Sequence, residues 1–206
     1  MSTPSAAPLP AASFDSDTVV QDTVRWLERA VIALNLCPFA KGVHTKEQIH
    51  YVVSAATDGR GLLQDLQREL EALAEIAPDQ RDTTLLMAPA CLGDFLDFND
   101  FLEVVDELID AMDLGGILQV ASFHPQFQFA GTEPDDVTNC TNRAPYPTLH
   151  LLREDSIDRA VEAFPEAEAI FERNIEVLEK LGMEGWQALD VGARCPVAHA
   201  PAKDGA

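Results

Sequence analysis

The sequence predicts an α/β or α+β fold in which a small sheet of three to four strands is covered by amphipathic helices. Apolar residues recur at helical spacing in several segments, and short apolar runs typical of strands separate them. The order is helix, then strand–helix–strand–helix–strand, then a long polar segment, a possible fourth strand and two more helices. This alternation favours an α/β arrangement. Since the residues do not reveal strand order, a ferredoxin-like arrangement stays the alternative.

The long helices are indicated by capping residues followed by apolar periodicity. The first begins at Asp15 and ends before Pro38, with an apolar face of Val20, Val24, Leu27, Val31 and Leu34. The second opens at Asp58, and its buried face is Leu62, Leu66, Leu70 and Leu73. Further helices are expected at about 93–112, 156–163 and 165–181. Gly182 is expected to cap the last helix.

Four short apolar runs are expected to form the strands. They lie at residues 49–54, 83–87, 117–123 and 148–152. Each has a length typical of a strand, and three of them are bounded by Gly or Pro. Residues 15–191 are therefore expected to form one domain, with a disordered leader at 1–14 and a disordered tail at 192–206.

The composition excludes several classes of partner. The chain has 14 Lys and Arg against 35 Asp and Glu, a formal charge of −21. A chain this acidic repels phosphate backbones and anionic membranes, so neither nucleic acid nor a membrane is an expected partner. The N-terminus lacks a basic start and an apolar core typical of a signal peptide. The four cysteines form no CxxC pair, and a cytoplasmic location with free thiols is expected.

The candidate functional surface is the polar segment of residues 122–154. A polar stretch of this length inside a compact domain is usually functional or disordered, and its aromatic residues and prolines indicate a fixed path. We interpret His124 and His150 as acid/base or ligand groups. Arg143 and Arg153 are expected to bind an anion, with Asn139, Asn142 and Asp136 completing the ligand-binding set. The alternative is a structural loop whose polar groups bind one another.

The sequence predicts that His124, Arg143, His150 and Arg153 converge in one cleft, with their side-chain tips within about 12 Å. One polar segment supplies all four, and it begins where α/β folds place their sites, past the carboxyl end of a strand.

Cysteine and metal chemistry are weighed separately. Cys37 is a possible thiol nucleophile, but it follows a helical face and sits at the negative end of the helix dipole, which favours a packing role. No HxH, HxxxH or HExxH spacing supports a metal site. Cys195-Pro in the tail, with His199, leaves regulatory haem binding as a minor alternative.

Four segments resemble an uncharacterised family, domain of unknown function 1415. They are residues 34–40, 119–125, 141–147 and 149–154, and the resemblance covers roughly residues 18–186. The chain departs from the family's pattern at Ala144, where a serine is expected, and at Cys140, where another residue, often aromatic, is expected. The resemblance implies a family name and no established activity.

The function expected from these observations is an enzyme or binding domain for a small anionic molecule, built on the polar loop after the third strand. A non-catalytic acidic module that binds a basic partner is the first alternative, and a metal- or haem-binding protein is the second. The sequence does not identify a cofactor or an oligomeric state.

Overall fold

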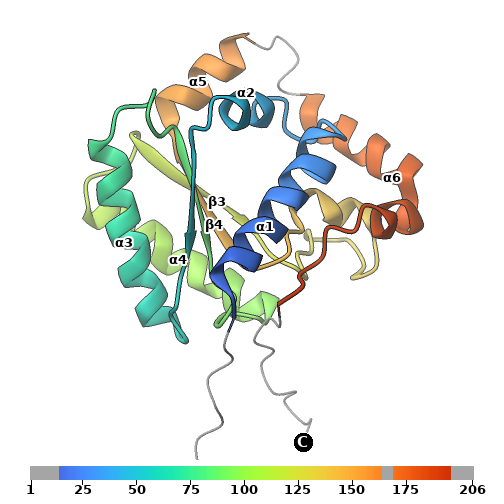
Figure 1. The fold of residues 1–206 in the computed structure, drawn as a ribbon, viewed down its shortest axis with the longest axis horizontal. Helices are drawn as coiled ribbons and strands as arrows, with labels where there is room; N and C mark the ends of the chain where they lie inside the picture. Colours follow the sequence, from blue (N-terminus) through green and yellow to red (C-terminus); the bar gives the residue numbers. More distant parts are fainter. Residues whose placement is uncertain (1–13, 164–168, 196–206) are drawn as a thin grey trace, which may run out of the picture.

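The computed structural model describes residues 14–163 and 169–195, and it contains a mixed four-stranded sheet between two layers of helices (Figure 1). Residues outside the described ranges include 1–13 of the predicted leader, the expected start of the last helix at 165 and most of the predicted tail, with His199. The fold is α/β, as predicted. Its chain order, strand–helix–strand–helix–strand–strand, differs from the strand–helix–strand–strand–helix–strand order of a ferredoxin-like fold.

The sheet has the order β1-β2-β4-β3. Its strands are β1 (Ile49–Val53), β2 (Thr83–Met87), β3 (Leu118–Phe123) and β4 (Thr148–Arg153). β1 and β2 are parallel, whereas β4 is antiparallel to both β2 and β3. β4 is therefore the one strand that runs against the other three.

One face of the sheet packs against α3 (Gly59–Glu75) and α4 (Phe95–Ala111). Asp58 and Asp94 cap these helices by accepting hydrogen bonds from backbone N–H groups of their first turns. The predicted leucine stripe of α3 is fully buried and meets Leu86, Leu149 and Leu151 of the sheet. Local capping and periodicity thus agree with the tertiary packing on this side.

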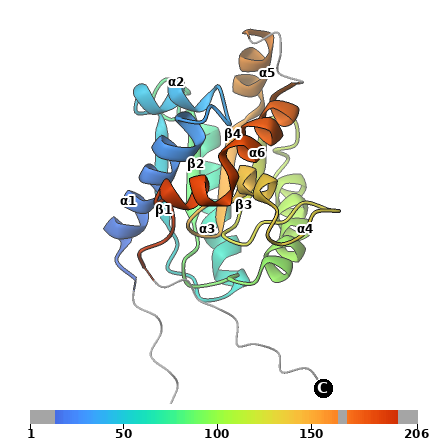
Figure 2. The same cartoon turned by 90° about the vertical axis from the view of Figure 1, so that its right-hand side faces the viewer.

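The other face is covered by α1 (Ser16–Trp26), the π-helical turn η1 (Leu27–Ile32) and α6 (Ile170–Ala188) (Figure 2). The short helix α2 (Ala40–Thr45) follows η1, and α5 (Glu154–Ala163) continues directly from β4. α6 packs on η2 (Val137–Asn142), a 3-10 helix inside the polar loop. This layer therefore holds the loop against the sheet.

The first helix departs from its predicted face. Leu27 and Val31 of the predicted face are buried, whereas Val20, Val24 and Leu34 are only partly buried. The most buried positions are Val19, Asp22, Thr23, Trp26 and Ala30, so the inward stripe runs beside the predicted one. The wider turn of η1 then changes the helical phase. α6 differs as well, because Gly182 does not end it. Gly182 adopts a φ of 65°, which kinks the helix, and helical structure resumes to Ala188.

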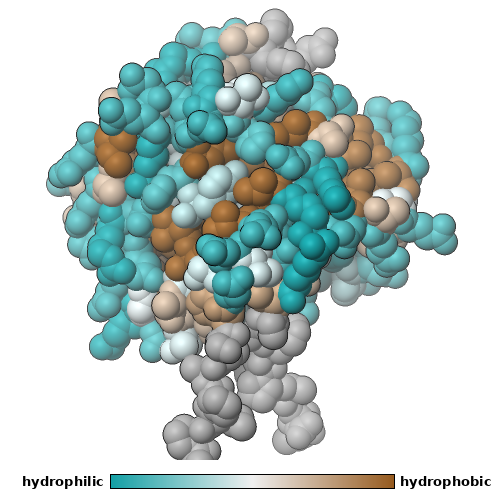
Figure 3. Space-filling model, in the orientation of Figure 1, coloured by the Kyte–Doolittle hydropathy of each residue, from teal (hydrophilic) through white to brown (hydrophobic). Residues whose placement is uncertain are grey.

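The surface is dominated by hydrophilic side chains, with apolar residues gathered in a broken band across the face that α1 crosses (Figure 3). Among the described residues, no helix is both long enough and apolar enough to cross a membrane.

Candidate functional site

The predicted functional loop connects β3 to β4 and is held by its own polar groups. Asn139 is fully buried and accepts hydrogen bonds from Phe129 N (2.9 Å) and the Thr132 hydroxyl (2.8 Å). Its side-chain amide donates to Glu133 O at 2.8 Å. Asp136 caps η2 by accepting from Thr138 N. The loop is therefore a fixed structure whose internal bonding matches the structural alternative for these two residues.

Asn142 and the backbone of the loop end bind the end of β3. The Asn142 side-chain amide donates to Ser122 O at 3.3 Å, and His124 N donates to Asn142 O at 3.1 Å. These bonds fasten the last residues of the loop to its first residues. Asn142 thus positions the loop rather than facing an open cavity.

Arg143 is the cation of this loop. Its Nε donates to Phe127 O at 3.1 Å and its Nη2 to Pro134 O at 2.6 Å. No carboxylate of the described residues lies within ion-pair distance of it. No lysine or arginine occurs between Arg81 and Arg143. Arg143 is therefore the first basic residue after 61 residues that carry only acidic charges. The Thr138 hydrogen bonds and, to a lesser degree, the Arg143 charge lower the pKa of Asp136.

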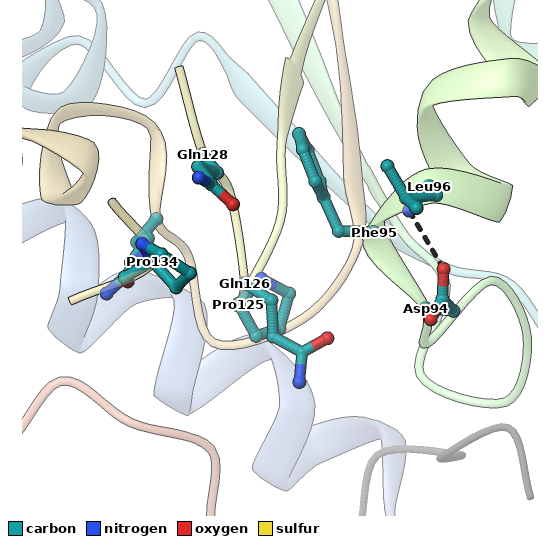
Figure 4. A pocket seen from close by; sticks show the side chains of 8 residues that line it. Asp94, Phe95, Leu96, Pro125, Gln126, Gln128 and Pro134 are labelled. Atoms are coloured by element: carbon teal, nitrogen blue, oxygen red, sulfur yellow. Dashed lines mark hydrogen bonds between the residues drawn. The ribbon is translucent and has the colours of Figure 1, made fainter. Parts of the chain in front are cut away.

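Two neighbouring pockets share Arg143 and Pro125. The first, the loop pocket, has a volume of about 410 Å³ (Figure 4). Phe95 and Leu96, from the start of α4, form one side of it, and the loop forms the other. Its complete lining is Asp94, Phe95, Leu96, Pro125, Gln126, Gln128, Pro134 and Arg143.

The second pocket, the tryptophan pocket, has a volume of about 260 Å³. It is lined mainly by apolar side chains and by the backbone after α6. Trp26 and Trp186 both border it, and they are the two tryptophans of the chain. The complete lining is Trp26, Pro125, Arg143, Ala144, Pro145, Trp186, Val191, Gly192 and Ala193.

His124 is buried behind the loop pocket and is held neutral. Its Nδ1 accepts from Gln126 N at 3.0 Å, so its Nε2 carries the hydrogen and donates to Leu92 O at 3.1 Å. Its ring lies 5.5 Å from Phe95 and 5.1 Å from Phe98 between ring centroids. Burial lowers the pKa of His124 to about 4. Both nitrogens are engaged, and the geometry offers no support for the catalytic role expected from the sequence.

His150 lies on the opposite face of the sheet from His124. The Thr83 hydroxyl donates to Leu151 O at 2.6 Å, so it accepts from Nε2 of His150 at 2.7 Å. The His150 ring lies 6.0 Å from the ring of Phe123, and burial lowers its pKa to about 4. A neutral imidazole bound to a neighbouring strand supports the sheet and is not exposed to the loop pocket.

Arg153 lies at the far end of the sheet. It pairs with Leu118 at the start of β3, whereas His124 follows the end of that strand, so the two are separated by roughly 20 Å along the strands. Its guanidinium donates to Leu73 O at 2.6 Å and to Ile76 O, carbonyls at the end of α3. Arg153 therefore caps a helix. The prediction that the two histidines and two arginines converge in one cleft is wrong, and of the four only Arg143 lines the loop pocket and the tryptophan pocket.

Cys37 lies partly buried beside the cluster of Trp26, Leu27 and Val31. Burial raises the pKa of its thiol, in the direction expected from its place after a helix. Among the described residues, no group of three or more His, Cys, Asp or Glu side chains is arranged to hold a metal ion.

The comparison with known proteins agrees with the motifs of the sequence. A family model described as a protein of unknown function (DUF1415) matches residues 18–188, most of the chain. The chain belongs to the DUF1415 family. No curated protein and no solved structure matches it. The family match covers both sides of the Arg143 loop and ends with α6.

This DUF1415 chain has a second polar cluster, at Asp22, that sequence reasoning missed. Asp22 is 1% exposed, and its Oδ2 accepts from the Tyr146 hydroxyl at 2.7 Å and from Arg194 N at 2.6 Å. Arg25 lies 2.8 Å from its Oδ1. The only signal in the sequence is that Asp22 lies beside the predicted apolar face of the first helix. A small rotation of the helix would expose this position, so the sequence alone does not indicate that Asp22 is buried.

The cluster fastens a C-terminal strap, residues 189–195, across α1. Arg25 donates to Asp190 O at 2.7 Å and to Gly192 O at 2.8 Å, and Cys195 N donates to the Tyr146 hydroxyl at 3.2 Å. Four of these residues belong to the segment that the sequence assigns to a tail. In this DUF1415 chain the strap forms one wall of the tryptophan pocket and lies beyond the family match.

Proposed function

We propose that the protein binds a small anionic molecule at Arg143, in the loop pocket. One observation carries the proposal: Arg143 lines both pockets, and its guanidinium hydrogen bonds go to backbone carbonyls rather than to carboxylates. A guanidinium without a carboxylate partner keeps its charge available to a ligand. In a chain of charge −21, such a site attracts an anion against the field around it.

The lining of the loop pocket supports this class of ligand. Gln126 and Gln128 supply side-chain amides that donate hydrogen bonds, next to the N-terminal turn of α4. A volume of about 410 Å³ lies within the range of small-molecule sites. Carboxylate and phosphate are the groups that a guanidinium binds with two parallel hydrogen bonds. The proposal is for binding, and it assigns no catalytic role to the histidines.

The remaining residues of the predicted set have supporting roles. Asn139, Asn142 and Asp136 fix the path of the loop, and His124 packs behind Phe95 at the pocket wall. All four cysteines are free, which supports the cytoplasmic location that belongs to the same proposal.

The test is the thermal stability of the full chain in the presence of inorganic phosphate and of citrate, at matched ionic strength. A bound anion raises Tm. We expect this rise to be lost in Arg143→Gln and partly kept in Arg143→Lys, because lysine retains the charge without the planar fork. Gln126→Phe, which fills the pocket while leaving the bonds of Arg143 in place, is also expected to lose it. Arg60→Gln, at an exposed arginine of α3, is the control.

The proposal fails if the four proteins and the parent chain respond equally to both anions. It also fails if Arg60→Gln loses as much of the response as Arg143→Gln, since that result indicates general screening of charge.

The outer face of α4 favours a second candidate, an acidic surface for a basic protein partner. The helix carries six acids and no basic residue in the sequence FLDFNDFLEVVDELIDA, and Leu96 and Val104 on it are 70% and 38% exposed. Apolar anchors within an acidic face suit a basic amphipathic segment. Binding of a lysine-rich amphipathic peptide that is lost in Leu96→Asp supports this candidate, and equal binding by both proteins contradicts it.

A further inference from the structure

The tryptophan pocket differs in chemistry from the loop pocket beside it. Trp26 is 2% exposed and meets Phe123 edge to face at 5.1 Å, so its ring is held in place. Trp186 comes from the last turns of α6, after the kink at Gly182. Pro145 and Val191 add further apolar walls. Because Trp26 is almost fully buried, the accessible aromatic surface of the pocket comes mainly from Trp186, with Pro145 beside it and one cation at the border.

We propose that the tryptophan pocket is an aromatic subsite, and that the ligand is a planar ring that carries an anionic group. The ring lies against Trp26 and Trp186, and its anionic group reaches Arg143. This inference rests on the proposed function, because the anion is the one that Arg143 binds. It adds the chemical class of the rest of the molecule.

The position of Arg143 leads to a single ligand with two parts. Arg143 and Pro125 line both pockets, so a molecule that fills the tryptophan pocket has a guanidinium at its edge. Flat aromatic rings gain from offset or edge contacts with tryptophan beyond the area that they bury. A volume of about 260 Å³ limits the ring to one or two fused cycles. A small anion without a ring leaves this pocket unfilled.

The strap sets the size of the subsite. Val191, Gly192 and Ala193 close one side, and Arg25 holds this segment by its backbone carbonyls. Ala193 lines the pocket and is an exposed residue, so a larger side chain at this position can fill part of the pocket without displacing the core. The strap lies beyond the residues that the family model matches.

The experiment uses 19F NMR of the full chain labelled with 5-fluorotryptophan. The chain has two tryptophans, and both line the pocket, so both resonances report on it. The probe is 2-naphthoate. Its matched controls are 2-naphthalenemethanol, which has the ring without the charge, and cyclohexanecarboxylate, which has the charge without an aromatic ring. We expect 2-naphthoate to shift both resonances to saturation and both controls to bind about tenfold more weakly, the loss of one charge-assisted or aromatic contact.

Two filling variants separate the pockets. Ala193→Leu is expected to abolish the response to 2-naphthoate and to keep the response of Tm to phosphate, because the guanidinium is untouched. Gln126→Leu is expected to weaken phosphate more than 2-naphthoate. A cavity-filling change at an exposed position costs little stability, so loss of folding does not imitate the result.

The outcomes also distinguish the two proposals. No saturable shift with 2-naphthoate, while phosphate still depends on Arg143, overturns the aromatic subsite alone. Equal affinity for 2-naphthoate and 2-naphthalenemethanol, unchanged in Arg143→Gln, shows an apolar pocket without an anion site. That result overturns this inference, and it overturns the proposed function as well when the Tm response to phosphate is also unchanged in Arg143→Gln.

Discussion

The Asp22 carboxylate accepts a hydrogen bond of 2.7 Å from the Tyr146 hydroxyl across 124 positions of sequence. Both side chains are almost fully buried. The same carboxylate oxygen accepts from Arg194 N, and the tyrosine oxygen accepts from Cys195 N. The pair therefore joins three parts of the chain: the first helix, the entry to β4 and the strap. Since the carboxylate is 1% exposed, each donor that it loses leaves a buried oxygen with one hydrogen bond fewer, while Arg25 still balances its charge.

Tyr146→Phe is expected to lower the free energy of unfolding by about 1–3 kcal/mol, because Asp22 then keeps a buried oxygen with one donor fewer. Tyr51→Phe is the matched control. The Tyr51 hydroxyl is buried and has no hydrogen-bond partner among the described residues, so its removal is expected to cost nothing or to stabilise slightly. Urea unfolding of the two variants gives the comparison. Equal losses in both contradict the role assigned to Asp22.

A chain that ends at Val191 is expected to be less stable than one that ends at Cys195. The shorter chain loses Arg194 N and Cys195 N, the strap donors to the Asp22–Tyr146 pair, and we expect a loss of about 1–3 kcal/mol. Thermal unfolding of both chains measures it. Indistinguishable Tm values restore the view that everything after 191 is a tail.

Stability is expected to fall as the pH falls from about 6.5 to 4. The unfolded chain takes up a proton at His124 near its ordinary pKa of 6.5, whereas the folded chain resists until about pH 4. Above pH 6.5 the neutral His124 makes its full contribution to the free energy of unfolding. Between pH 6.5 and 4 this contribution falls by about 3 kcal/mol, because the unfolded chain binds roughly one proton more than the folded chain. His150 is expected to add a similar slope.

The check for His124 is the pH dependence of unfolding in His124→Asn. The asparagine oxygen can still accept from Gln126 N, so the turn is kept while the titrating group is removed. We expect the slope between pH 4 and 6.5 to decrease by about one proton relative to the parent chain. An identical slope in both proteins assigns the pH dependence to other groups.

Cys37 is expected to react slowly with iodoacetamide near neutral pH, because burial raises the pKa of its thiol and the thiolate is the reactive form. Intact mass and peptide analysis after brief labelling give the rate, with a free model thiol as the reference. Cys37→Ala is expected to cost about 1–2 kcal/mol and to leave anion binding unchanged. Labelling faster than the model thiol supports a thiol nucleophile in place of a packing residue.

Most of the fold was predictable because local signals and tertiary packing agree in it. Asp58 caps α3, Asp94 caps α4, and the leucine stripe of α3 is buried as its spacing indicates. The first helix was harder. Its inward face includes Asp22, and apolar periodicity cannot identify a buried acid whose partners lie far along the chain. A phase change at a π-helical turn leaves no local signal either.

The site was only partly predictable, because the strand order and register decide which of the predicted side chains lie close together. His124 and Arg153 belong to one polar segment in the sequence, but the antiparallel pairing of β3 and β4 places them at opposite ends of the sheet. His150 and Arg153 are three residues apart and point to opposite faces of β4. The loop between β3 and β4 lies where the sequence places it, and Arg143 lines two pockets, although its role as an anion ligand stays a prediction. The tryptophan pocket is lined by residues from α1, the loop, α6 and the strap, which lie far apart in the sequence, so no local pattern predicts it.

The absence of lysine and arginine between Arg81 and Arg143 has a practical consequence for protein chemistry. Trypsin cleaves only after these two residue types, so the unfolded chain releases residues 82–143 as one peptide, with β2, α4, β3 and nearly the whole loop in it. Cys91 and Cys140 travel together in this fragment, whereas Cys37 and Cys195 are released on separate peptides. A single digest therefore distinguishes alkylation of the two fully buried thiols from alkylation of the two partly exposed ones.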